Sequence, residues 1–131
     1  MGHTIAIAIG GALGALSRYW TVGWVSVYIE DRFPDLDSFP FGTLVVNILG
    51  SLLIGVSYIL IVEKMHLTPH WQAIVMVGFL GAFTTFSTFS LETLVLLQDG
   101  RTLAGLGYIF ASVVICLAAV SAGMWTAKQF I

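Results

Sequence analysis

Four long apolar segments, separated by short charged ones, dominate this 131-residue chain. They cover about 4–29, 39–62, 69–97 and 102–127, and each holds 24 residues or more. A helix of about 20 apolar residues crosses the hydrocarbon core of a bilayer. Backbone polar groups in lipid must be satisfied within the segment, which favours helices over strands. The expected fold class is therefore an all-α integral membrane protein, a single membrane domain over 1–131 with four transmembrane helices.

The charge content supports this assignment and excludes other classes of protein. Only 9% of the residues are charged and 58% are hydrophobic, whereas about 25% of a soluble domain is charged. Five Lys and Arg residues and a net charge of −2 exclude a basic nucleic-acid binder. The single cysteine cannot form an intrachain disulfide. The expected location is the cell (plasma or inner) membrane, as a multi-pass protein in contact with the lipid bilayer.

The ends of the segments carry local signals. Thr68 followed by Pro69 is typical of a helix N-cap with proline at the first helical position. Gly100 is expected in the turn between the third and fourth segments. The segment 30–40, with five charges and two prolines, is expected outside the membrane. His3, His66 and His70 lie at segment ends without metal-ligand spacing.

The loop cations give no preferred orientation. Lys64 and Lys128 would lie on one side of the membrane, and Arg32 and Arg101 on the other. The positive-inside rule therefore gives a balance of two against two. Either a small protein simply has few charges, or the chain inserts in both orientations and forms an antiparallel dimer.

Polar residues at membrane depth are costly and mark candidate sites. Arg18 lies inside the first segment, on one helix face with Gly10 and Gly14. It is either functional or an interfacial anchor that snorkels to the headgroups. Two further stripes recur every four residues and are either functional or polar packing: Thr43, Asn47 and Ser51 in the second segment, and Tyr108, Ser112 and Cys116 in the fourth.

The third segment contains the most unusual stretch, GFLGAFTTFSTFS at 78–90. Two glycines before a Thr pair weaken a helix, so we predict an interruption at about 81–85. Backbone groups freed at that depth would line a cavity or bind an ion. The alternative is a regular helix whose hydroxyls bond to their own i−4 carbonyls. Glu92 follows and is expected to meet water near the end of the segment or, if buried, to be paired or protonated.

These polar stripes suit a small anion. They are rich in hydrogen-bond donors and, apart from Glu92, lack carboxylates. Phe83, Phe86 and Phe89 recur every three residues, and the positive edge of an aromatic ring can contact an anion. No nucleophile–base pair, phosphate loop or dinucleotide fingerprint is present, so no enzyme is expected.

The sequence resembles the small fluoride channel family (Fluc/CrcB). The resemblance rests on GALSR at 14–18, GTLVVN at 42–47 and GFLGAFTTFSTF at 78–89, in this order over essentially the whole chain. It implies passive, fluoride-selective export that gives fluoride resistance, through two pores of an antiparallel dual-topology homodimer. It also implies a structural Na⁺ ion at the dimer centre.

Matching positions imply particular site residues. The backbone carbonyls of Gly81 and Thr84 would hold Na⁺. Glu92 matches an acidic position of the family. The implied fluoride pathway comprises Asn47, Phe86 and Phe89, with Ser87 and Thr88 nearby, the track residues Tyr108 and Ser112, and Arg18 near a vestibule.

Two positions depart from the family pattern, and two other functions compete. Ala82 stands where many members have glycine, and Cys116 where a hydroxyl is common. A small multidrug-type proton-coupled exporter shares the size and the dual topology, but it should carry a carboxylate in its first span, where this chain has Arg18. A non-transporting membrane assembly subunit would use the same stripes only for packing.

Overall fold

The computed structural model describes residues 2–34, 39–64 and 68–130. Helix α1 (Gly2–Arg32) forms the first long helix, and α2 (Phe41–Ser57) continues without a gap into the π-helical η2 (Tyr58–Lys64). The third comprises α3 (Pro69–Trp71), the π-helical η3 (Gln72–Leu80), α4 (Gly81–Phe83) and α5 (Phe86–Gln98). Helix α6 (Thr102–Phe130) ends the bundle. Asp35, Asp37 and His66 of the predicted loops lie outside the described residues.

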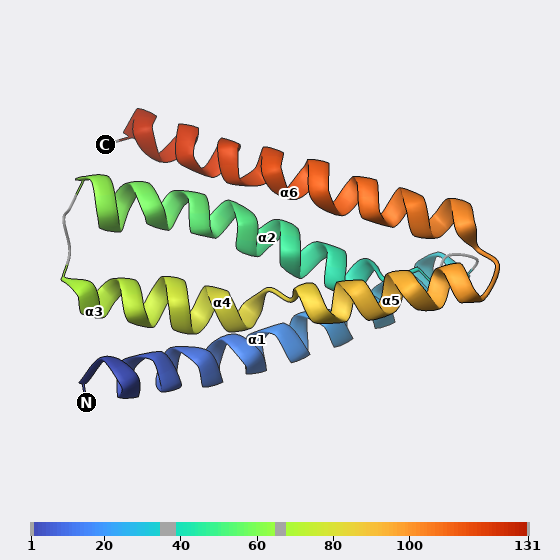
Figure 1. The fold of residues 1–131 in the computed structure, drawn as a ribbon, viewed down its shortest axis with the longest axis horizontal. Helices are drawn as coiled ribbons and strands as arrows, with labels where there is room; N and C mark the ends of the chain where they lie inside the picture. Colours follow the sequence, from blue (N-terminus) through green and yellow to red (C-terminus); the bar gives the residue numbers. More distant parts are fainter. Residues whose placement is uncertain (1, 35–38, 65–67, 131) are drawn as a thin grey trace.

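The predicted spans are confirmed. Four helical segments, 2–32, 41–64, 69–98 and 102–130, are long and apolar enough to cross a membrane, and the chain is a multi-pass membrane protein. They run up and down beside one another, with both termini at one end of the bundle (Figure 1). All four helices extend past the predicted limits at one or both ends, by one to three residues, and the second begins two residues later than predicted.

Glycines set how closely the helices approach. A Cβ at Gly10 would collide with the backbone carbonyl of Ile74 in η3, and one at Gly14 with that of Phe79. A methyl at Gly55 of α2 would likewise meet the α6 backbone at Val120. Backbone contacts this close are typical of helices that associate in lipid. The predicted small-residue face of α1 thus packs against the third span.

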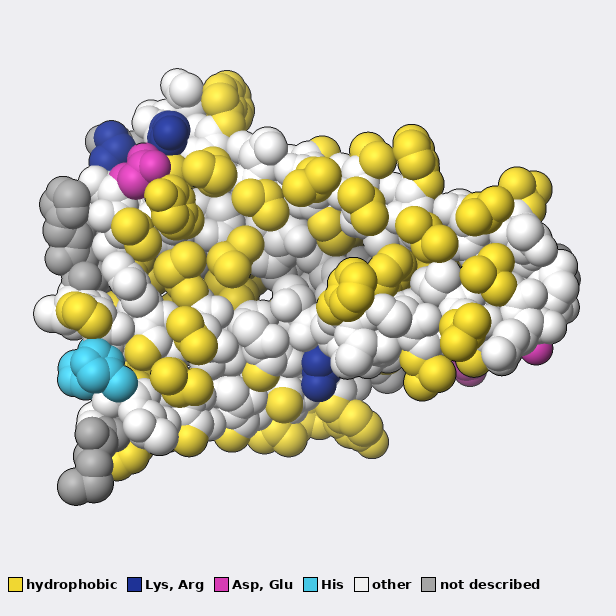
Figure 2. All heavy atoms as spheres, in the orientation of Figure 1, with side chains coloured by type: hydrophobic (Ala, Val, Ile, Leu, Met, Phe, Trp, Pro, Cys, Tyr) yellow, Lys and Arg dark blue, Asp and Glu magenta, His cyan; other side chains and the backbone are white. Residues whose placement is uncertain are grey.

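The surface agrees with a bilayer environment. In Figure 2 apolar side chains cover the length of the visible face, and most charged side chains gather towards its ends. Large apolar residues such as Trp24, Phe110 and Leu103 are exposed in the isolated chain. The buried interior is small and is centred on Phe89, Leu96 and Tyr108.

The predicted helix ends are also in place. Thr68 is the N-cap residue of α3 and Pro69 follows in its first turn, although no side-chain capping bond forms. Gly100 adopts a φ of 75° in the turn before α6, a conformation that glycine adopts without strain.

Candidate functional site

The third span is interrupted at its centre. Helix α4 ends at Phe83, and α5 begins at Phe86. Between them Thr84 (φ −82°, ψ 161°) and Thr85 (φ −152°, ψ 119°) are extended. The hydroxyl oxygen of Thr85 accepts the backbone N–H of Thr88 at 3.2 Å and so caps the new helix. The predicted interruption is confirmed, and we call these two residues the break.

Asn47 of α2 holds one side of the break. Its Oδ1 accepts the backbone N–H of Thr85 at 2.8 Å, while its Nδ2 donates to the Thr85 carbonyl oxygen at 3.1 Å. The Thr85 N–H needs an acceptor and the Thr85 carbonyl needs a donor. Only the orientation with Oδ1 towards the N–H and Nδ2 towards the carbonyl satisfies both groups. The amide has a second N–H that neither bond uses. Asn47 thus holds in place an extended residue whose N–H makes no helical hydrogen bond.

Arg18 of α1 holds the other residue of the break. Its half-buried guanidinium donates from Nη1 to the carbonyl oxygen of Thr84 at 3.2 Å. An arginine at membrane depth needs such acceptors, because its charge is otherwise unsatisfied. A residue from the first span and one from the second therefore stabilise the break in the third.

Backbone carbonyls at the break lose their usual helical partners, and those of Gly81 and Thr84 are among them. In a regular helix the carbonyl of Gly81 would accept from the N–H of Thr85, and that of Thr84 from Thr88. Here the Thr85 N–H bonds to the Asn47 amide, and the Thr88 N–H bonds to the Thr85 hydroxyl. These are the two carbonyls that the resemblance implies as Na⁺ ligands.

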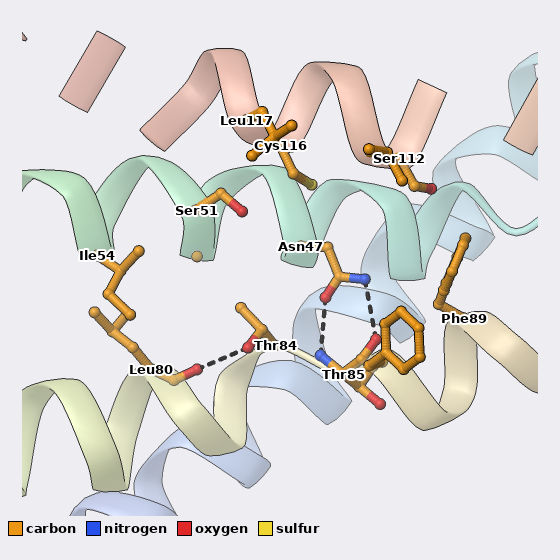
Figure 3. Close-up of a pocket in the computed structure, with 13 residues that line it drawn as sticks. Asn47, Ser51, Ile54, Leu80, Thr84, Thr85, Phe89, Ser112, Cys116 and Leu117 are labelled. Carbon is orange, nitrogen blue, oxygen red and sulfur yellow. Dashed lines mark hydrogen bonds between the residues drawn. The ribbon is translucent and has the colours of Figure 1, made fainter. Parts of the chain in front are cut away.

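A cleft of about 430 Å³ opens between the break, α2 and α6, and we call it the α6 cleft. Figure 3 shows Asn47, Ser51, Ser112 and Cys116 around it. The Phe86 and Phe89 rings also line it, with centroids 5.4 Å apart and planes tilted by 50°. The cleft thus combines aromatic rings with a few polar groups from three spans.

Ser112 is a buried polar group of this cleft that lacks a partner within the described residues. Its residue is only 7% exposed, and among the residues that the structure describes its hydroxyl oxygen has no hydrogen-bond partner. A buried hydroxyl without a partner costs free energy. Ser112 thus lines the cleft and carries a hydroxyl whose hydrogen-bonding capacity is unused.

A second cleft, of about 610 Å³, lies between α1, α2 and α5 on the other side of the break, and we call it the α1 cleft. Arg18, Trp20 and Trp24 line it from α1, and Thr88 and Glu92 from α5. It therefore holds one embedded cation and one carboxylate. Thr85 lines both clefts, so the break forms the wall between them.

Glu92 is half-buried and makes two side-chain hydrogen bonds, which is the paired alternative, and it also lines the α1 cleft. Thr43 of α2 donates its hydroxyl to Glu92 Oε1 at 2.8 Å, and Tyr108 of α6 donates to Oε2 at 2.8 Å. Tyr108 is fully buried against Phe89. Hydrogen bonds to a carboxylate are stronger than neutral ones. The two bonds to Glu92 therefore hold α2 and α6 against α5, on the C-terminal side of the break.

The structure brings some of the predicted pathway residues together and separates others. Asn47, Phe86, Phe89 and Ser112 share the α6 cleft, whereas Arg18 and Thr88 line the α1 cleft. Ser87, 3.3 Å from the Thr85 hydroxyl, and Tyr108 are not among the lining residues of either cleft. Sequence reasoning missed Thr85. A hydroxylic residue at the start of a new helix is the signal that would have identified it as a cap.

Comparison with known proteins assigns the chain to a family. The sequence profile of the family described as "CrcB-like protein, Camphor Resistance (CrcB)" matches residues 5–124. The chain belongs to the CrcB family. Proteins named "Fluoride-specific ion channel FluC" are similar to it. That of Hahella chejuensis is 52% identical over 122 residues, 93% of this chain and 91% of its own length. That of Saccharophagus degradans is 49% identical over 117 residues, 88% and 82% of the two chains.

Membership of the CrcB family extends over nearly the whole bundle. A FluC protein of Rhizobium meliloti is 42% identical over 124 residues, covering 95% of this chain and 94% of its own. The family match includes α1 from its second turn, the break, both clefts and α6 as far as Met124. The α6 cleft and the α1 cleft therefore both lie within the region that matches the family.

Proposed function

We propose that this CrcB-family protein is a fluoride-selective channel that exports fluoride passively. The observation that carries the proposal is the Ser112 hydroxyl, which is buried and unpaired on the wall of a cleft within a membrane-spanning bundle. The nature of the ion follows from the relatives, which are named fluoride-specific ion channels.

The lining of the α6 cleft suits a small, strongly hydrated anion. Within the described residues, Ser112 and the second N–H of Asn47 are donors without a protein partner. The edges of Phe86 and Phe89 add partial positive charge without a full cation. No carboxylate is among the lining residues of this cleft. Several weak contacts allow an ion both to enter and to leave, as conduction requires.

We further propose an antiparallel homodimer with two pores. Gly81, Phe86, Ser87 and Thr88 lie at or beside the break in the middle of the third span, and all are exposed in the isolated chain. Irregular backbone at membrane depth is tolerated only where protein or a water-filled cavity surrounds it. A second copy would cover it, and the balanced loop cations permit that copy to insert in the opposite orientation.

The same break fits a structural Na⁺ ion. The carbonyls of Gly81 and Thr84 would hold it, because their helical N–H partners bond elsewhere. Oxygen ligands suit a hard cation. The ion would supply positive charge at the centre of the dimer. The Thr84 oxygen has two lone pairs, so the bond from Arg18 leaves one of them available.

Reconstitution tests the channel. Purified protein in liposomes loaded with fluoride and chloride should release fluoride rapidly and retain chloride, with ion-selective electrodes as the readout. A folded protein that passes no fluoride would refute the channel and favour an assembly subunit. Release of an organic cation driven by a proton gradient would favour the multidrug-type exporter instead.

The topology and the cation need separate measurements. A Lys128→Cys variant in a Cys116→Ser background should be labelled by an external, membrane-impermeant thiol reagent in half of its chains. Labelling of all chains or of none would refute dual topology. Replacing Na⁺ by choline should lower the Tm of the solubilised protein, and an unchanged Tm would count against the structural ion.

A further inference from the structure

Cys116, the single cysteine of the chain, lies on the α6 wall of the α6 cleft. It is half-buried and stands one helical turn after Ser112. Figure 3 shows its sulfur pointing from α6 towards α2, on the side of Asn47 and Ser51. The thiol thus faces the cleft.

Ser112 gives independent evidence that the cleft receives a polar occupant. Other hydroxyls in the bundle bond back to a carbonyl one turn earlier, as Ser90 does to Phe86 at 2.9 Å and Ser121 to Leu117 at 2.9 Å. Ser112 is more than nine-tenths buried and makes no such bond. A water molecule or ion is the partner we expect for this hydroxyl, and Cys116 lines the same cleft one turn away.

We infer that Cys116 is a water-accessible thiol site that captures soft cations such as Hg²⁺ and thereby blocks fluoride permeation. The inference rests on the proposed channel function. Thiolate sulfur is a soft ligand that prefers soft metal ions over the hard cations bound by carbonyl oxygens. The site is therefore chemically distinct from the one proposed for Na⁺.

The capture step is a ligand exchange without redox change. The S–H bond of Cys116 breaks and its proton passes to water, while a bond forms between sulfur and mercury, which stays in its +2 state and loses one chloride. With HgCl₂ the adduct is a neutral S–Hg–Cl group on the wall of the cleft that Ser112 and the Phe rings also line. Its bulk would obstruct the path of an anion through the cleft.

The test uses the full chain in liposomes. HgCl₂ should abolish fluoride efflux and add one mercury per chain by intact mass, because the chain has one cysteine. A reducing dithiol should remove the metal and restore efflux. The matched control is Cys116→Ser, which has no thiol, and its efflux before and after HgCl₂ should be equal.

A second probe separates access from water and access from lipid. A trimethylammonium-ethyl methanethiosulfonate cannot enter lipid. The Cys116 sulfur would form a disulfide with it as methanesulfinate leaves, and the thiol proton would pass to water. We expect this charged reagent to modify the wild-type chain in liposomes. Modification only by lipid-soluble N-ethylmaleimide would overturn the inference by locating the thiol in lipid.

The outcomes also distinguish this site from the channel proposal. Full adduct formation with unchanged fluoride efflux would place Cys116 outside the path and overturn the inference while leaving the channel intact. A protein that conducts no fluoride at all refutes the channel. Even then, the masses after treatment with the charged reagent decide whether Cys116 is open to water.

Discussion

Replacing Asn47 by alanine should both destabilise the protein and disable the site. The change removes the bonds of 2.8 and 3.1 Å to the backbone of Thr85, a residue only 8% exposed. Each buried backbone group left without a partner costs about 1–3 kcal/mol. Two such groups give about 2–6 kcal/mol in unfolding free energy, a large fraction of the about 5–15 kcal/mol typical of a folded protein.

The structure also limits how far the protein can recover. If the break closes into a regular helix, the Thr85 N–H regains the carbonyl of Gly81 as its partner. About half of the cost then disappears, but the residues that line both clefts shift. Asn47→Ala should therefore lose fluoride efflux even under conditions where it remains folded.

Two measurements check this reasoning against a matched control. Ser51→Ala alters the same helix one turn further on, in the same cleft, and in the described part of the chain Ser51 makes no side-chain hydrogen bond. Unfolding in detergent gives the free energies, and hydrogen exchange of the break peptide reports the Thr85 amide. If Asn47→Ala matched Ser51→Ala within about 0.5 kcal/mol, the range of an inconsequential substitution, the role of Asn47 at the break would be refuted.

Three further predictions concern packing, the buried carboxylate contact and the rings. Gly10→Ala should cost about 1–3 kcal/mol, because the new methyl meets a backbone carbonyl of η3. Gly107→Ala, with open space around it, should instead stabilise by about 0.5–1 kcal/mol, and equal shifts in the two unfolding curves would contradict the close approach. Tyr108→Phe keeps the buried ring but removes the 2.8 Å bond to the α5 carboxylate. It should lower the unfolding free energy by about 1.5–3 kcal/mol, and no loss in chemical denaturation would mean that the bond contributes nothing. Phe86→Ile should impair fluoride efflux without weakening the fold of the single chain, since that ring is 78% exposed in the isolated chain, whereas Phe89→Ile, at 8% exposure, should lower both efflux and the stability of that fold. Unchanged efflux in both variants would remove the ring edges from the mechanism.

The sequence alone determined the four helices and the position of the break. Apolar length is a local property, and a membrane span requires little more than an uninterrupted segment of about 20 residues. Glycines followed by Thr84 and Thr85 weaken the third helix wherever that segment is placed. The face that joins Gly10 and Gly14 followed from helical periodicity, and it packs as expected. The family resemblance rested on local motifs in the same way.

Only the tertiary structure decided what the polar side chains contact. A stripe of Thr43, Asn47 and Ser51 shows which way the donors point but not what meets them. Their partners belong to other spans: Thr43 meets Glu92, and Asn47 meets the backbone at the break. Periodicity within one helix carries no information about the angle and depth at which the next helix packs. For the same physical reason the sequence could name Ser112 as a donor, whereas only the packed bundle leaves it buried, unpaired and facing a cleft.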